Sequence, residues 1–296
     1  MAWRKPQSDT LILICVTVLV VYLVLTPLGM LIWNSLKTTP PGVPGTLTLA
    51  NFANAYSDPT LYPLLLNSLW FAAGSTVFAF FFAFTMAWLV ERTNTPLRDL
   101  AYVIAVVATI IPGMIASIAW IMLLHPRIGL INLALAKSFG LSEAPLNIHS
   151  MYGMIFVAGL RQVPVMFLLL AGALRSMDPS LEESSSTCGS GHSSTMRRIT
   201  FPLMLPASAA AMIYSFINAV EAFEIPALLG MPVKFYVFAT KIYLAMHQSP
   251  PDYGVSAALG TTVLAISAVG TLFYLRILRK SERFVTVTGK DRKSVV

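Results

Sequence analysis

Five stretches of this chain lack any charged residue for longer than a membrane-spanning helix requires. They contain 27, 32, 27, 22 and 23 residues, at 10–36, 59–90, 100–126, 199–220 and 253–275. A helix crosses the bilayer core in about 20 residues. The runs show no two-residue alternation, which argues against barrel strands, and only helices satisfy their own backbone polar groups in lipid. The pattern therefore predicts an all-α, polytopic membrane protein.

The composition excludes the soluble alternatives. Only 11% of the 296 residues are charged, 56% are hydrophobic and the mean hydropathy is +0.72, whereas soluble domains carry about 25% charged residues. A cytosolic enzyme, a disordered chain and a disulfide-stapled module are excluded. The two cysteines, Cys15 in a span and Cys188 in a loop, cannot meet. Without a Cys/His cluster at ligand spacing, no metal and no cofactor are predicted.

A sixth apolar stretch, 152–174, is interrupted only by Arg161. Six spans are therefore predicted, between an N-terminal tail (1–10) and a basic C-terminal tail (279–296), within a single domain at 11–278. The predicted spans are 11–34, 63–90, 101–124, 152–174, 203–229 and 255–278.

The distribution of Lys and Arg predicts the orientation of these spans. An even number of spans puts both termini on one side, and that side holds 14 of the 20 basic residues, against 5 on the other. Because basic residues are enriched in cytoplasmic loops, both termini are predicted to be cytoplasmic. The net charge of +7 is then mainly a topology signal, and no nucleic-acid partner is predicted.

The loop 176–202 falls on the predicted cytoplasmic side. Its sequence Asp178-Pro179 followed by Glu182 is typical of a helix start, because proline suits the first turn and acids favour its positive end. A short helix is expected there, although a solvated connector would carry the same pattern.

The second half of this loop contains two helix breakers, Gly189 and Gly191. A second short helix over 193–199 is expected to end before Pro202, because the residue before a proline disfavours the helical conformation. The whole loop is therefore predicted to form a helix, a turn and a helix under the membrane.

The spacing in this loop resembles the EAA signature of inner-membrane permeases of type I ABC importers. That signature is Glu-Ala-Ala, three residues, Gly, nine residues, Ile, two residues and Pro. Glu183, Gly189, Ile199 and Pro202 stand at those positions, before the last two predicted spans. The six-span pattern extends the resemblance over nearly the whole chain and implies the type I ABC importer permease fold.

The chain departs from the signature at its two alanines, which are Ser184 and Ser185 here. Serine costs about 0.5 kcal/mol per helical position relative to alanine, so the short helix should be weaker. The side chains remain small enough for close packing.

The resemblance implies a mechanical role in a bacterial inner (plasma) membrane. Two permease domains form the pore, and the second is another copy, a different permease or a fused copy. Each presents its loop as a coupling helix to a cytoplasmic ABC ATPase dimer, and an external binding protein delivers the solute. The implied ATPase-coupling residues are Glu182, Glu183, Ser184, Ser185, Gly189, Ile199 and Pro202.

This chain contains no phosphate-cradling glycine loop followed by Lys-Ser/Thr. ATP hydrolysis is therefore assigned to a separate subunit, and the chain is not expected to be an enzyme.

Three ionisable residues fall inside predicted spans, where they are costly and usually face a cavity or a partner. Arg161 and Glu221 each lie nine residues from the external end of a span, about 13 Å deep, so an ion pair between them is predicted. Asn218, Glu221 and Glu224, spaced by three, would share one helix face. With Arg161 they are the predicted translocation path. The alternative is interhelical pairing that only holds the bundle together.

The segment Glu221–Gly230 resembles permeases of the ferric-iron and polyamine-type importers, with the ferric branch more similar. Ferric iron is thus the expected cargo, and a polyamine or another small solute is the alternative. That branch often carries two six-span copies in one polypeptide, so this chain would correspond to one copy, either a stand-alone half or a truncated one.

A secondary transporter or channel is the rival from another class. Such proteins are often built from inverted repeats with paired broken helices, and no repeat is evident between the first and last three spans. An intramembrane enzyme would need a catalytic constellation in the spans, whereas the histidines fall in loops or at span edges.

Overall fold

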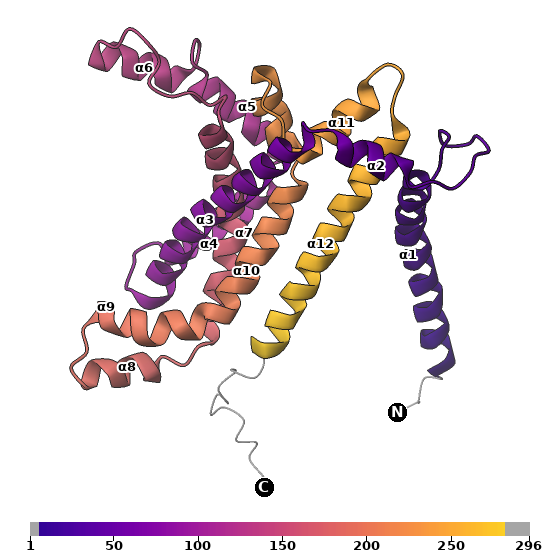
Figure 1. Cartoon of the computed structure of the whole chain (residues 1–296). Helices are drawn as coiled ribbons and strands as arrows, with labels where there is room; N and C mark the ends of the chain where they lie inside the picture. Colours follow the sequence, from indigo (N-terminus) through magenta and orange to yellow (C-terminus); the bar gives the residue numbers. More distant parts are fainter. Residues whose placement is uncertain (1–5, 282–296) are drawn as a thin grey trace. The chain divides into compact units, whose positions relative to one another are not determined.

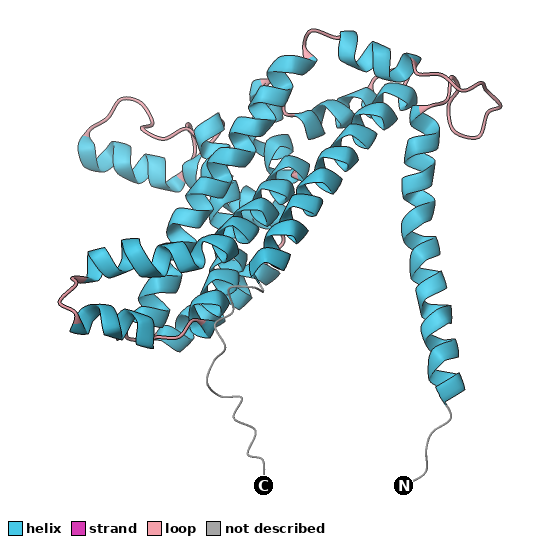
Figure 2. Ribbon diagram, turned by 60° about the horizontal axis from the view of Figure 1, so that its bottom comes forward, coloured by secondary structure: helices cyan, strands magenta, loops and turns pink. Residues whose placement is uncertain are grey.

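The computed structural model describes residues 6–281, which form helices joined by loops (Figures 1 and 2). Among these residues, the β-structure consists of one isolated bridge between Lys37 and Leu47. Within residues 6–281, five helices are long and apolar enough to cross a membrane, and two bent pairs raise the number to as many as seven. The predicted all-α, polytopic class is confirmed.

The helices follow one another along the chain as labelled in Figure 1. They are α1 (Pro6–Ser35), α2 (Ala50–Ser57), α3 (Leu61–Arg92), α4 (Arg98–Ile110), α5 (Gly113–Leu124), α6 (Leu130–Phe139), α7 (Met151–Ser176), α8 (Ser180–Thr187), α9 (His192–Thr195), the π-helix η1 (Met196–Thr200), α10 (Phe201–Glu221), the π-helix η2 (Pro226–Gly230), the 3-10 helix η3 (Met231–Val233), α11 (Phe238–His247) and α12 (Tyr253–Ser281).

Four predicted spans coincide with single helices, namely α1, α3, α7 and α12. α1 begins at Pro6, within the predicted N-terminal tail, and α12 runs to Ser281, within the predicted C-terminal tail. The remainder of both tails, 1–5 and 282–296, lies outside the described residues.

The predicted third span, 101–124, is not one straight helix. α4 ends at Ile110 and α5 begins at Gly113, with a bend of 100° between them. Pro112 causes the break, because it lacks a backbone N–H and disfavours the helical conformation at Ile111, whose ψ is 121°.

The predicted fifth span, 203–229, is wrong at its second end, and its helix also extends upstream of 203. Its helix starts upstream, since α9, η1 and α10 run together from His192 to Glu221. It stops at Ala222, which has an extended backbone with ψ 123°. The helix therefore does not continue to 229 as predicted. It is followed by a second bent pair, formed by 226–233 and 238–247, with an angle of 75° between the two members.

The chain divides into two compact units. The first comprises residues 1–62 and 241–265. Within it, the Tyr56 hydroxyl lies 2.7 Å from Thr262 Oγ1, and Lys241 Nζ lies 2.7 Å from Asp58 Oδ2. The most apolar 18-residue window of α1 is entirely unburied in the structure, as expected for a surface facing lipid or another apolar protein surface.

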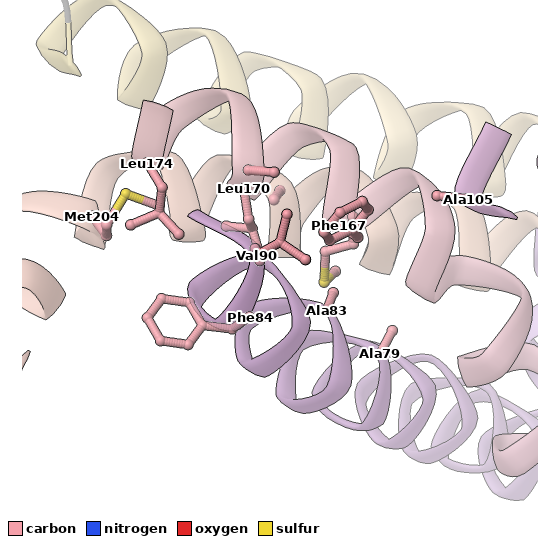
Figure 3. Packing of buried hydrophobic residues seen from close by; sticks show 13 residues of the cluster. Ala79, Ala83, Phe84, Val90, Ala105, Phe167, Leu170, Leu174 and Met204 are labelled. Carbon is pink, nitrogen blue, oxygen red and sulfur yellow. The ribbon is translucent and has the colours of Figure 1, made fainter. Parts of the chain in front are cut away.

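The second unit, 63–240 with 266–296, has a core between α3, α4, α7 and α10 (Figure 3). Ala79, Ala83 and Ala87 repeat every four residues on α3 and are fully buried. Lipid provides no hydrophobic driving force for helix association, so helices associate through close packing, which such small side chains permit. Phe167 and Leu170 of α7 fill the space beside them.

Candidate functional site

The loop 176–202 starts with α8, a polar helix in which no side chain is buried. Asp178 Oδ1 accepts a hydrogen bond from the Ser180 backbone N–H at 2.9 Å. This hydrogen bond lowers the pKa of the Asp178 carboxyl group. Glu182 and Glu183 occupy the first turn, where the helix dipole favours negative charge.

The residues at the signature positions of α8 differ in accessibility. Glu183 and Ser184 are exposed, and Ser185 is half-buried. The Ser185 hydroxyl lies 2.9 Å from Thr195 Oγ1 in α9, so this serine ties the two short helices together. The exposed Glu183 and Ser184 remain available to a protein that docks on α8.

Gly189 terminates α8 in a left-handed conformation with φ 83°. Its N–H donates to Ser186 O at 2.9 Å, and the Ser190 N–H donates to Ser185 O at 3.1 Å. These two bonds form the Schellman motif, which favours glycine at this position because a side chain is strained there. The expected turn is therefore present at Gly189.

The second helix of the loop does not end before Pro202. α9 and η1 continue without interruption into α10, so the expected separate helix over 193–199 is wrong. The Phe201 N–H bonds to Met196 O, five residues earlier. This widened π turn accommodates Pro202, which cannot donate a helical hydrogen bond. Ile199 is half-buried in this turn and Pro202 is exposed.

Glu182 points toward the helix bundle rather than away from it. Its Oε2 forms an ion pair with Arg92 Nε at 2.7 Å. Its Oε1 accepts a hydrogen bond from the Thr200 hydroxyl at 2.6 Å. The two acids of the signature region thus differ: Glu182 is held within the protein, and Glu183 is exposed.

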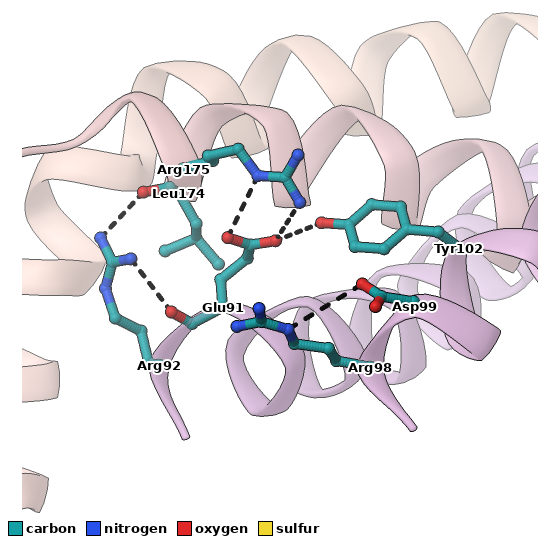
Figure 4. A network of polar contacts seen from close by, with 7 residues as sticks. All are labelled: Glu91, Arg92, Arg98, Asp99, Tyr102, Leu174 and Arg175. Atoms are coloured by element: carbon teal, nitrogen blue, oxygen red, sulfur yellow. Dashed lines mark hydrogen bonds and ion pairs between the residues drawn. The ribbon is translucent and has the colours of Figure 1, made fainter. Parts of the chain in front are cut away.

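A second acid, Glu91, joins three helices beside this ion pair (Figure 4). Arg175 of α7 reaches the Glu91 carboxylate through Nη2 at 2.9 Å and Nε at 3.4 Å. The Tyr102 hydroxyl of α4 donates to the same carboxylate, and the Arg175 guanidinium lies 5.0 Å from the Tyr102 ring centroid.

Glu91 and Arg92 are not among the site residues predicted from the sequence. A signal was available, because Glu91 is an acid among the basic residues that mark the predicted cytoplasmic edge. The basic residues that surround Glu91 are determined by the packing of α3, α4 and α7. The span boundaries alone do not specify this packing.

A cavity of about 580 Å³ opens in the second unit between α4, α7, α10 and the segment 222–225. The four predicted path residues, Arg161, Asn218, Glu221 and Glu224, all line it. Gln162 and Ser215 are not among the predicted path residues, and the serine hydroxyl donates a hydrogen bond to Gln162 Oε1. The cavity therefore combines charged and neutral polar groups at the depth of the spans.

The ion pair within this cavity differs from the prediction. Arg161 Nη1 lies 3.3 Å from Glu224 Oε2, and the structure gives no ion pair between Arg161 and Glu221. α10 ends at Glu221 and Ala222 is extended, so Glu224 does not continue the expected helix face. Glu221 is exposed and supplies the second carboxylate of the cavity.

The first residue of α5 lies against this ion pair. A Cβ placed on Gly113 would lie 2.2 Å from Glu224 Oε2 and 2.4 Å from Arg161 Cζ. Any side chain at this position would displace the pair. The bend at Pro112 thus brings the N-terminal end of α5, which attracts negative charge, to the Glu224 carboxylate.

Residues 79–283 match the family described as "Binding-protein-dependent transport system inner membrane component". The putative ferric transport system permease protein FbpB 1 of Haemophilus influenzae is 30% identical over 223 residues, which cover 75% of this chain and 34% of that protein. The inner membrane ABC transporter permease protein YdcU of Escherichia coli is 29% identical over 202 residues, covering 64% of each chain. This chain thus spans about a third of the length of the ferric permease.

Solved structures share the fold. A chain of a bacterial alginate ABC transporter, in complex with an alginate pentasaccharide-bound periplasmic protein, superposes with a TM-score of 0.75 at 19% identity. The superposition covers 93% of this chain and 96% of that one. An amino acid ABC transporter chain superposes with a TM-score of 0.51 over 80% of this chain and 99% of that one, at 15% identity.

Proposed function

This chain belongs to the family of binding-protein-dependent transport system inner membrane components, and from that premise we propose that it is a pore-forming permease subunit of a type I ABC importer. The observation that carries the proposal is the loop 176–202. Its signature residues lie inside the family match, and α8 leaves Glu183 exposed while Glu182 is held by the bundle. A short helix held at the end of a bundle of spans can receive force from a cytoplasmic protein.

The proposed partner of α8 is a cytoplasmic ABC ATPase dimer. Glu183 and Ser184 contact the ATPase, and Ser185, Gly189, Ile199 and Pro202 keep the loop in shape for this contact. ATP hydrolysis belongs to the partner, so this chain is a transport subunit and not an enzyme. With six spans and the loop after the fourth, a cytoplasmic loop places both termini in the cytoplasm, as the distribution of Lys and Arg also favours.

The cavity between α4, α7 and α10 is the proposed translocation path. Arg161, Glu221 and Asn218 are exposed, and charged groups at span depth require water or a polar protein surface. A second permease domain, as another copy, a different subunit or a fused copy, completes the path. An external binding protein delivers the cargo to it.

Ferric iron is the proposed cargo. Relatives at 30% and 29% identity are named as ferric transport permeases. The cavity also favours a cation, because Arg161 neutralises only one of its two carboxylates and Glu221 remains. A polyamine, which is also cationic, is the alternative and shares this charge argument.

Reconstitution tests this function. The chain would be expressed with an ABC ATPase and an external binding protein from the same organism, and the assembly would be placed in liposomes. Uptake of radiolabelled ferric iron should require ATP and the binding protein, and an excess of a polyamine should not compete. Iron uptake that is independent of ATP would contradict an importer and favour a channel or secondary transporter.

The coupling role of Glu183 is tested in the same system. Glu183→Arg should abolish ATPase association and uptake, because it reverses the exposed charge of the docking helix. Glu143→Arg, a reversal at an exposed acid of the loop after α6, is the matched control and should leave both unchanged. Normal uptake by Glu183→Arg would contradict the coupling role.

A further inference from the structure

We propose that Arg92 is a positioning residue, which together with Glu182 forms the joint that transmits the movement of α8 to the membrane-spanning helices. The inference rests on the proposed function and deepens it. Arg92 lies outside the loop 176–202, at the last position of α3.

The composition of α8 explains why such a joint is needed. Five of its eight residues are Ser or Thr, and none of its side chains is buried. Hydrophobic burial, the main source of attachment in most packed helices, therefore does not fasten α8 to the bundle. The position of α8 depends on polar contacts, which include the ion pair of Glu182 with Arg92.

The Arg92 guanidinium links its own helix, α3, to two others. Its Nε pairs with Glu182 Oε2 of α8 at 2.7 Å, and its Nη2 donates to Leu174 O of α7 at 2.8 Å. The Leu174 carbonyl lies in the last turn of α7 and also accepts a hydrogen bond from the Met177 N–H at 3.2 Å. Arg92 therefore adds a second donor to this carbonyl oxygen, which has two lone pairs. Figure 4 shows Arg92 reaching this carbonyl from the end of α3.

The second oxygen of Glu182 links α8 to a fourth element. Oε1 accepts a 2.6 Å hydrogen bond from Thr200, a buried residue in η1 at the base of α10. α10 carries the cavity residues Ser215, Asn218 and Glu221. A displacement of α8 therefore acts on α3 and α7 through Arg92, and on the cavity wall through Thr200.

The pair is sheltered from solvent. The Arg92 and Glu182 side chains are 11% and 16% exposed, whereas those of the nearby Arg98–Asp99 pair are 71% and 94% exposed at 3.9 Å. Exposed ion pairs contribute little to stability, but removal of one partner of an ion pair sheltered from solvent leaves an uncompensated charge. The Arg98–Asp99 pair therefore provides a matched control.

The experiment compares Arg92→Gln, Glu182→Gln, the swap Arg92→Glu with Glu182→Arg, and Arg98→Gln as control, each in the full transporter. The readout is uptake per ATP hydrolysed, measured beside assembly with the ATPase. Each single variant should assemble and hydrolyse ATP but lose about tenfold in uptake per ATP, in line with typical coupling free energies. The swap should recover most of this loss, and Arg98→Gln should match the unaltered chain.

Unchanged uptake per ATP in the single variants, or a swap no better than they are, would overturn the proposal. A parallel loss of assembly, ATP hydrolysis and uptake would assign a purely structural role and overturn it as well. If the variants at Arg92 and Glu182 fail to insert into the membrane, Thr200→Val is the deciding variant. A lower uptake per ATP in Thr200→Val supports the proposal, and an unchanged value overturns it. Failure of the proposed function is distinguishable, because the unaltered chain would then show no ATP-dependent uptake.

Discussion

Among single residues, Gly189 is required for its backbone conformation and not for lack of space. Its φ is 83°, yet a Cβ there would meet no atom within 4 Å. We expect Gly189→Ala to destabilise the end of α8 by about 1 kcal/mol, because only glycine adopts this conformation without strain. Faster hydrogen exchange of the α8 amides, and lower uptake, would be the measured result.

Two variants in the same turn control this prediction. Gly191 has φ −69° and also faces open space, so Gly191→Ala should leave exchange and uptake unchanged. Gly189→Asn should be milder than Gly189→Ala, because asparagine tolerates the left-handed conformation. Equal effects of both alanine substitutions would contradict the argument from backbone strain.

The Arg161–Glu224 ion pair predicts that substitutions at these two positions have non-additive effects on stability. Arg161→Gln leaves the Glu224 carboxylate without its cation, whereas Arg161→Gln with Glu224→Gln removes both charges. Because the side chains are 47% and 41% exposed, we expect the single variant to be less stable than the double by about 1 kcal/mol. Thermal unfolding in one detergent measures this, and a double variant no more stable than the single would refute the pairing.

The ion-pair partner of Arg161, which is Glu224, also shows which contacts cannot be predicted from the sequence. A spacing of three places Glu221 and Glu224 on one face only if the helix continues, and it ends at Glu221. The depth of Arg161 was predictable from the distance to the end of its span. Its partner depended on the extended residue Ala222, which carries no breaker signal of its own.

At the scale of helices, prolines illustrate the same limit. Pro27, Pro164 and Pro206 lie inside α1, α7 and α10, while Pro112 separates two helices by 100°. Neighbouring helices in a membrane can satisfy the backbone groups that a proline frees. A proline therefore marks a position where a break is possible, and tertiary packing determines whether the break occurs.

The contact of α11 with the residues after α2 should depend on pH. Lys241 Nζ lies 2.7 Å from Asp58 Oδ2, and this hydrogen bond, with those from Thr60, lowers the pKa of Asp58 from 3.8 to about 2. A lowered pKa stabilises the folded state above the unfolded value. The stabilisation should be present above about pH 4 and lost as the pH falls toward 2.

Asp58→Asn tests this dependence, because the amide cannot titrate. Hydrogen exchange of α2, corrected for intrinsic rates, should rise between pH 4 and 2 in the unaltered chain and stay flat in Asp58→Asn. Asp99→Asn, at a carboxylate that is 94% exposed, should behave like the unaltered chain. A rise of equal size in Asp58→Asn would assign the effect to another group.

For the whole molecule, the two native cysteines allow the proposed topology to be tested. Cys188 is exposed beside the Gly189 turn, and Cys15 lies in α1. In a Cys15→Ser variant, a membrane-impermeant maleimide should label Cys188 in inside-out vesicles and not in intact cells. Bound ATPase should slow this labelling. Labelling from the outer side would reverse the proposed orientation.

The length and class of the spans were predictable, because absence of charge over more than 20 residues has few other physical explanations. The ends of α3 and α7 accordingly fall within two residues of the predicted boundaries 63–90 and 152–174. The polar joint at Glu182 was not predictable, since it brings together residues 92, 174, 182 and 200. Contacts between distant segments follow from the packing of the bundle and leave no local pattern in the sequence.

The absence of buried side chains in α8 has a consequence for the divergence of such proteins. Surface substitutions usually change stability by at most about 0.5 kcal/mol, so the outer face of this eight-residue helix can change with little loss of stability while the lipid-embedded core stays the same. A duplicated copy could thereby acquire a different ATPase through a few substitutions, provided that Glu182 is retained. Recognition and permeation can then evolve as separate traits of one chain.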